Sequence, residues 1–173
     1  MKRKMFFIML TYLITCFFLL GPVFLGCGQS SSSVPLKIIE NRDHSGITKT
    51  GTQFVVISDC DRFSEVFKSI YSRTYSLPEL PTIDFDRQIV LAAFMGQKPT
   101  GGYHISFEKT AFVKNETLRV TVIMQTPSED ALLPQVVTSP YALAAADRGR
   151  YSRIEFVDMA GNILKISEMS GIN

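Results

Sequence analysis

Residues 103–125 read YHISFEKTAFVKNETLRVTVIMQ, and this stretch decides the fold class. Apolar and polar residues alternate over positions 103–108 and again over positions 118–125. Alternation with a period of two indicates β-strands that bury one face. Between these segments, Lys114-Asn115-Glu116 is typical of a turn, because Asn tolerates the left-handed backbone conformation. The stretch therefore predicts two half-buried strands of one sheet.

Further strands are predicted on both sides of this stretch. Short apolar runs that suit strands occupy residues 53–57, 89–94, 141–146, 153–157 and 163–166. The sequence Ala160-Gly161-Asn162 is typical of a turn that leads into the last of them. We therefore expect six to eight strands in all.

One amphipathic helix is predicted after the first of these runs. Its apolar residues recur at steps of three and four, which is typical of a helix that buries one face. They are Phe63, Val66, Phe67, Ile70 and Tyr71. Asp61 is the expected N-cap, and Pro78 and Pro81 fix an irregular connection after the helix. Strands and helix together predict an α+β domain, a mostly antiparallel β-sheet or sandwich with one amphipathic helix packed against it.

The amino terminus has the pattern of an export signal. Lys2-Arg3-Lys4 precede the apolar residues 5–20, and Gly21-Pro22 then interrupts the helix-forming run. Phe24-Leu25-Gly26-Cys27 follows, with the small residue directly before cysteine that a lipoprotein signal peptidase requires. We expect residues 1–26 to be a lipoprotein signal peptide and Cys27 to be the lipidation site.

The alternative for this segment is an uncleaved transmembrane helix, since residues 5–25 are nearly long enough to span a bilayer. The Gly21-Pro22 break and the cysteine at the end of the run favour lipidation. Both interpretations place the rest of the chain on the outer side of a membrane, in the bacterial cell envelope. Which membrane carries the anchor is left open.

Residues 27–35 are expected to be a lipidated cysteine with a Ser-rich tether, and residues 36–173 a single globular domain. The whole chain has 18 Lys and Arg against 16 Asp and Glu. Removing Lys2-Arg3-Lys4 leaves 15 basic residues against the same 16 acidic ones. This near-equal balance gives no sign of a basic patch that would bind nucleic acid.

Cys60 would have no cysteine partner and lies between two aspartates, which oppose thiolate formation, so we expect a half-buried structural thiol.

Two segments are the candidate partner-binding or fold-defining motifs. The first is Pro99-Thr100-Gly101-Gly102-Tyr103, where a glycine pair allows positive φ or close backbone approach. The second is Ser139-Pro140-Tyr141. In a partner-binding role, Tyr103→Ala and Tyr141→Ala should weaken partner capture with little change in melting temperature.

No catalytic residues are assigned from the sequence. Asp84-Phe85-Asp86 has no third ligand nearby in sequence and is interpreted as a turn and strand entry. His44 is expected in a loop and His104 on a polar strand face. No nucleophile elbow or clustered zinc ligands are found, so neither an enzyme, a metal site nor a cofactor is expected.

Several segments in order give the chain a family resemblance. They are Ser45-Gly46-Ile47, the helix, Ile83-Asp84-Phe85, the stretch from Gly96 through the Pro99-to-Tyr103 motif, and Ser139-Pro140-Tyr141. Over residues 36–146 this order resembles the C-terminal domain of PrcB-type proteins, envelope proteins associated with an outer-sheath protease complex. The resemblance implies a non-enzymatic accessory that binds, and helps stabilise or mature, a secreted or envelope protease.

Three functions remain open from the sequence. The first is a lipid-anchored module that binds a protein partner. The second is a small protease inhibitor, with residues 128–137 as its loop, or an enzyme with an unrecognised site. The third is a structural envelope lipoprotein without a dedicated client.

Overall fold

The computed structural model describes residues 31–169 of the chain. The predicted signal peptide, the lipidation site Cys27 and residues 28–30 and 170–173 lie outside these residues. Strand β1 (Ser32–Arg42) begins inside the expected tether, and its residues Ser32 to Pro35 pair with a neighbouring strand. Positions 32–35 are therefore part of the sheet and not of the tether. Within the described residues, no helix is both long and apolar enough to cross a membrane.

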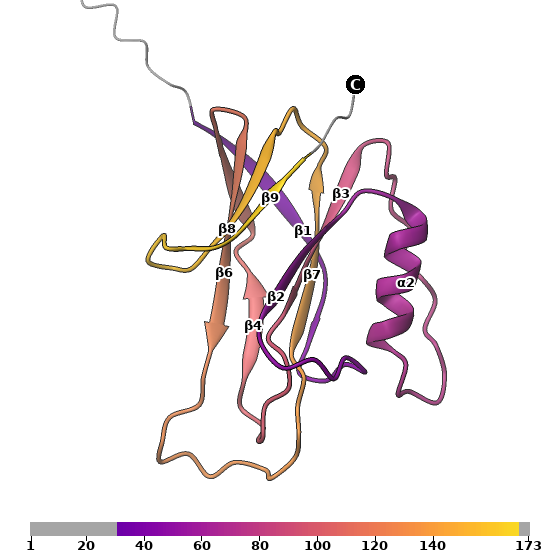
Figure 1. Cartoon of the computed structure of the whole chain (residues 1–173), viewed down its shortest axis with the longest axis vertical. Helices are drawn as coiled ribbons and strands as arrows, with labels where there is room; N and C mark the ends of the chain where they lie inside the picture. The colour runs from indigo at the N-terminus through magenta and orange to yellow at the C-terminus, as the bar shows by residue number, and fades with distance from the viewer. Residues whose placement is uncertain (1–30, 170–173) are drawn as a thin grey trace, which may run out of the picture.

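Residues 31–169 form nine strands of one sheet and one helix (Figure 1). After β1 follow β2 (Gln53–Ile57), the helix α2 (Cys60–Ile70), β3 (Gln88–Phe94), β4 (His104–Phe107), β5 (Thr110–Lys114), β6 (Thr117–Gln125), β7 (Tyr141–Asp147), β8 (Arg153–Val157) and β9 (Ile163–Glu168). The order across the sheet is β2-β3-β7-β1-β5-β6-β8-β9, and β4 pairs with β6. The long strand β1 joins two parts of this sheet, because its first half pairs with β5 and its second half with β7.

The sheet is mostly antiparallel, as expected, but it is mixed and nearly closed, which corrects the expectation of an open sheet or a sandwich. Among the described strands, β6 and β8 run parallel and all other pairs are antiparallel. Phe54 of β2 stacks on Phe156 of β8, with ring centroids 5.0 Å apart, so the two ends of the strand order approach each other. The right-handed twist of successive strands accumulates across a sheet of this size and curls it. The β-rich class with one helix is confirmed.

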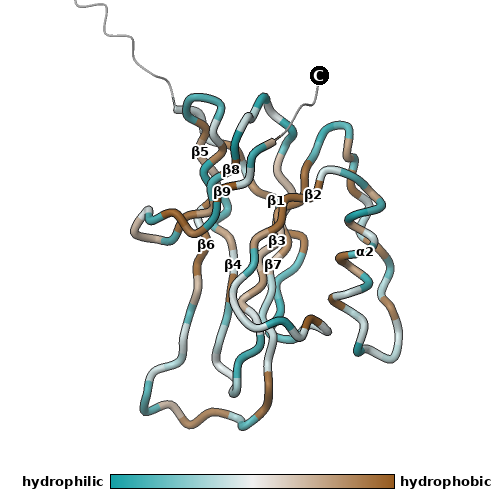
Figure 2. The backbone as a smooth tube through the Cα atoms, in the orientation of Figure 1, coloured by the Kyte–Doolittle hydropathy of each residue, from teal (hydrophilic) through white to brown (hydrophobic). Residues whose placement is uncertain are grey.

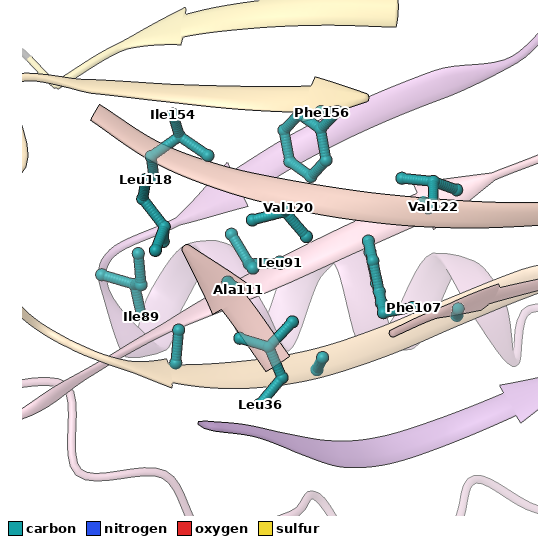
Figure 3. Packing of buried hydrophobic residues seen from close by; sticks show 14 of the residues in the cluster. Leu36, Ile89, Leu91, Phe107, Ala111, Leu118, Val120, Val122, Ile154 and Phe156 are labelled. Carbon is teal, nitrogen blue, oxygen red and sulfur yellow. The ribbon is translucent and has the colours of Figure 1, made fainter. Parts of the chain in front are cut away.

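The core has two parts, one on each side of β3 and β7. Side chains that point into the curled sheet form the first part, shown in Figure 3, where β3, β4, β6 and β8 contribute most of the large residues. Alternate residues of β3 and β7 face α2 and form the second part. Both strands are thus buried on both faces, which explains their continuous apolar sequences (Figure 2).

Helix α2 packs the predicted apolar face against the sheet, with Phe63, Phe67 and Ile70 almost fully buried. Its N-cap is Asp59, whose side chain accepts a hydrogen bond from the Arg62 N–H at 2.8 Å. The expected cap, Asp61, lies in the first turn instead. Asp59 is the cap because its backbone is extended, which lets its carboxylate accept from the N–H three residues ahead. Cys60, in the first turn, is exposed, so the expectation of a half-buried thiol is wrong.

Candidate functional site

The two sequence motifs meet at one end of the molecule. Lys98 and Thr138 exchange backbone hydrogen bonds of 2.9 and 3.0 Å, which join the stretch before β4 to the stretch before β7. The Thr138 hydroxyl also donates to the Thr100 carbonyl at 2.9 Å. We call this end, formed by residues 95–103 and 126–140, the motif end; it lies at the bottom of Figure 1.

Ser139 ties a third segment to the motif end. Its backbone N–H donates to the Asp43 carbonyl at 2.9 Å, and its hydroxyl donates to the Ile47 carbonyl at 2.8 Å. The Ser45 hydroxyl in turn donates to Ser139 Oγ at 3.0 Å. The Pro140 carbonyl accepts from the Met95 N–H at 2.9 Å. Because Ser139 is only 5% exposed, these bonds hold residues 43–47 against the strand entry and offer little surface to a partner.

Tyr141 is fully buried between the sheet and α2. Its ring stacks on Phe94 with centroids 6.4 Å apart, and its hydroxyl donates to the Tyr71 hydroxyl at 3.3 Å. The Tyr71 hydroxyl lies 2.6 and 2.7 Å from the two Glu40 carboxylate oxygens, and Arg42 pairs with the same carboxylate. Of the two roles predicted for Tyr141, this burial favours the fold-defining one. A nearly unchanged melting temperature for Tyr141→Ala does not fit this burial.

Burial also changes the acid–base behaviour of the two phenols. It raises the pKa of Tyr141 above its usual range, and the hydrogen bond with Tyr71 raises this pKa further. Burial and the hydrogen bond to Glu40 raise the pKa of Tyr71 in the same direction. Both hydroxyls therefore stay protonated well above neutral pH.

The glycine pair of the first motif lies under the loop of residues 126–137. Gly102 has φ of +84°, and a Cβ built on it would stand 2.8 Å from Leu133 Cδ2 and 3.1 Å from Pro127 Cβ. A Cβ on Gly101 would stand 3.1 Å from Pro134 Cγ, and the Gly101 N–H donates to the Pro134 carbonyl at 3.1 Å. The glycine pair was expected to allow positive φ or close approach, and Gly102 shows both. The partner of this close approach is the chain's own loop.

The other residues of the first motif are partly accessible. Pro99 is exposed, while Thr100 and Tyr103 are half-buried. Lys98 Nζ lies 5.4 Å from the centre of the Tyr103 ring, a cation–π geometry.

Loop 126–137 exposes large apolar side chains at the motif end. Leu132 is fully exposed, and Val136 and Val137 are 45% and 59% exposed. Internal bonds from Ala131 N–H to the Ser128 carbonyl and from Val136 N–H to the Pro134 carbonyl shape the loop. Figure 2 shows hydrophobic stretches along it. The loop therefore combines a few backbone hydrogen bonds with apolar side chains that face solvent.

His104 and Asp84 are the other polar candidates named in the sequence. His104 Nδ1 lies 3.0 Å from Asp43 Oδ1, and its Nε2 lies 3.5 Å from Asn41 Nδ2. Asp84 accepts backbone bonds from Arg87 and Gln88, which confirms the turn predicted there. Residues 31–169 contain no group of three His, Cys, Asp or Glu side chains placed to hold a metal ion.

A groove of about 680 Å³ lies between α2, β2 and residues 46–49. In the described part of the chain, none of the eight predicted motif residues lines it. The groove is thus separate from the surface that the motifs build.

The segment that carries both motifs has a family match. Residues 89–146 match the PrcB C-terminal family model. The predicted resemblance is confirmed for this segment, which runs from β3 to β7 and includes loop 126–137. The PrcB C-terminal match does not extend to Ser45-Gly46-Ile47, α2 or Ile83-Asp84-Phe85, although the expected resemblance began at residue 36. No curated protein and no solved structure matches the chain.

Proposed function

We propose that the protein is a lipid-anchored, non-enzymatic envelope protein that binds a protein partner, a secreted or envelope protease that it stabilises or helps mature. The observation that carries this proposal is the PrcB C-terminal match over residues 89–146, which includes both motifs and the loop between them. The amino-terminal pattern that ends at Cys27 supports the anchor.

The motif end supports a binding role in two ways. Its buried residues, such as Ser139 and Tyr141, hold the backbone in place. Its exposed residues, such as Leu132 and Val137, offer apolar surface to a partner. A pre-organised apolar surface binds with a smaller loss of conformational entropy than a flexible one.

Protease inhibition is the second candidate function, and loop 126–137 favours it. An inhibitor needs an exposed, rigid loop, and this loop is exposed and carries backbone hydrogen bonds of its own and one to Gly101. Purified domain added to envelope proteases separates the two functions. A longer lifetime of the protease supports the stabilising accessory, whereas a loss of its activity supports the inhibitor.

Crosslinking in cells tests the primary proposal. We expect full-length protein to be recovered in the membrane fraction with one reproducible envelope protein, identified as a protease by mass and activity. The Cys27→Ser variant should lack the lipid and therefore differ in mass from the mature protein, and it should leave the membrane if its signal peptide is removed. Recovery of no reproducible partner, or a Cys27→Ser variant of unchanged mass that stays membrane-bound, would contradict the proposal.

A further inference from the structure

Strand β1 runs from one end of the molecule to the other. Its first residue, Ser32, pairs with Val113, beside the β5–β6 turn at residues 114–116. Its last residue, Arg42, pairs with Tyr141, directly after the second motif. We call the end near residues 114–116 the hairpin end; it lies opposite the motif end (Figure 1). The 11 residues of β1, at about 3.3 Å each, separate the two ends by roughly 35 Å.

The proposed anchor is close to the hairpin end in sequence. Four residues lie between Cys27 and Ser32, and the five residue-to-residue steps of a fully extended chain span at most about 18 Å. A lipid on Cys27 therefore holds the hairpin end within this distance of the bilayer. The inverted orientation, with loop 126–137 in the bilayer, would lift Ser32 by roughly 35 Å, about twice the available reach.

The charge on the loop also opposes contact with lipid. Glu129 and Asp130 are exposed in the same loop as Leu132. Carboxylates are repelled by a bilayer surface that contains anionic lipids. A protein surface with an apolar pocket beside basic side chains complements both the leucine and the acidic pair.

We propose that Leu132, Val136 and Val137 form a docking surface for a water-soluble envelope protein, presented at the membrane-distal end of the domain. This inference rests on the proposed lipid anchor and partner-binding function, and it adds which surface binds and how far from the membrane it lies. The glycine pair contributes to this docking surface by positioning the loop that carries it. Gly101 and Gly102 let Pro134 and Leu133 lie directly on the motif, and this contact fixes the loop that carries Leu132.

The first experiment measures orientation without any partner. Lipidated full-length protein carrying Cys60→Ser is labelled with a donor dye at Leu132→Cys or at Lys114→Cys. It is then reconstituted into vesicles of phosphatidylethanolamine and phosphatidylglycerol that contain an acceptor lipid. We expect strong energy transfer from position 114 and much weaker transfer from position 132. Equal or stronger transfer from position 132 would overturn the membrane-distal placement.

A variant with a longer link serves as the control for this measurement. Insertion of a Gly/Ser segment of about 20 residues after Ser31 should reduce the difference between the two positions, because a flexible chain of that length lets the domain turn over. If the difference is unchanged by the insertion, the short link does not set the orientation, and this part of the inference is wrong.

The second experiment locates the docking surface. A photo-crosslinking amino acid replaces Leu132 in one variant and Phe112 in the other, in cells. Phe112 is the matched control, because it is apolar and 50% exposed but lies at the hairpin end. We expect a protein adduct of one mass from position 132 and none of that mass from position 112. Lipid adducts from position 132 would show a membrane surface instead and overturn the proposal.

Substitutions then test whether the same surface carries affinity. The double variant Leu132→Asp/Val137→Asp should reduce recovery of the crosslinked protein by at least about tenfold, whereas Phe112→Asp should leave it unchanged. Both variants should keep the melting temperature, because these side chains face solvent. If the double variant still captures the partner fully, the docking surface is wrong while the proposed function stands. If neither full-length protein nor any crosslinking position recovers a partner, the proposed function fails as well.

Discussion

Tyr71 at the end of α2 and Tyr141 at the start of β7 share a hydrogen bond of 3.3 Å, and both phenols are buried. The bond continues from Tyr71 to Glu40 of β1, so one polar chain joins the helix to two strands. Because both tyrosine pKa values lie above the ordinary value of 10.0, the folded state favours the protonated phenols more than the unfolded state does. Their contribution to stability is therefore fully present below about pH 10 and is lost as the pH rises further.

We predict alkaline destabilisation that depends on these two hydroxyls. The free energy of unfolding, measured by urea titration between pH 8 and pH 11.5, should fall above about pH 10. In the double variant Tyr71→Phe/Tyr141→Phe this fall should be smaller, since the buried groups that titrate are gone. Tyr75→Phe is the control, because Tyr75 is fully exposed, and it should follow the unmodified protein. Identical slopes for the double variant and the unmodified protein would exclude the buried phenols as the cause.

Tyr141→Ala and Tyr103→Ala should differ strongly in stability. Removing the fully buried Tyr141 ring leaves a cavity between β7 and α2, and we expect a loss of about 3–5 kcal/mol. Tyr103 is half-buried with Lys98 above its ring, and its removal should cost about 1 kcal/mol. Thermal and urea unfolding of both variants measures the difference. A melting temperature unchanged by Tyr141→Ala would show that this residue does not pack as the structure has it.

Gly102→Ala and Gly161→Ala form a matched pair for the contact between loop and motif. The two glycines have φ of +84° and +85°, so an added methyl group is strained to the same degree in both. Nothing lies within 4 Å of a Cβ at position 161, whereas Leu133 and Pro127 meet a Cβ at position 102. Gly161→Ala should therefore cost about 1 kcal/mol, and Gly102→Ala clearly more.

Limited proteolysis of the same two glycine variants measures how firmly loop 126–137 is held on the motif. Cleavage within residues 126–137 should become faster in Gly102→Ala, because the displaced Leu133 no longer holds the loop on the motif. Gly161→Ala, in the turn between β8 and β9, should leave that cleavage unchanged. Equal cleavage in both variants would mean that the glycine pair does not position the loop.

The pattern of apolar and polar residues predicted most of the strands. The strands that it did not predict depend on pairing with distant parts of the chain. The alternation in residues 118–125 and the turn at Asn115, with φ of 49°, are encoded by neighbouring residues and were predicted from them. Strands β1 and β5 were not predicted. The first residues of β1 are Ser-rich and exposed, and β5 is short with Ala111 as its one fully buried residue. Both are strands because of their partners across the sheet, which a window of neighbouring residues does not contain.

The same limit applies to the candidate site. The sequence indicated both motifs, and the alternation in residues 103–108 placed the first beside a strand. It did not show that Lys98 pairs with Thr138, because 40 residues separate them. It also did not show that Tyr141 is buried, since this follows from the place of β7 between β3 and β1 under α2, where it is covered on both faces. The parallel pairing of β6 with β8 is likewise set by the path of the whole chain.

Ser139 and Ser45 should be energetically coupled. Ser139 Oγ donates to the Ile47 carbonyl and accepts from Ser45 Oγ, with almost no access to water. Ser139→Ala leaves the partly buried Ile47 carbonyl without this donor and should cost about 1–3 kcal/mol, whereas Ser45→Ala, at a half-buried site, should cost about 1 kcal/mol. In a double-mutant cycle, the double variant should lose at least about 0.5 kcal/mol less stability than the sum of the two single losses, because each single variant already removes the bond between the Ser45 and Ser139 hydroxyls. Ser33→Ala, on an exposed part of β1, is the control and should be close to neutral. Strict additivity of the two losses would show that the hydroxyls do not interact, and residues 43–47 would then need another source of attachment to the motif end.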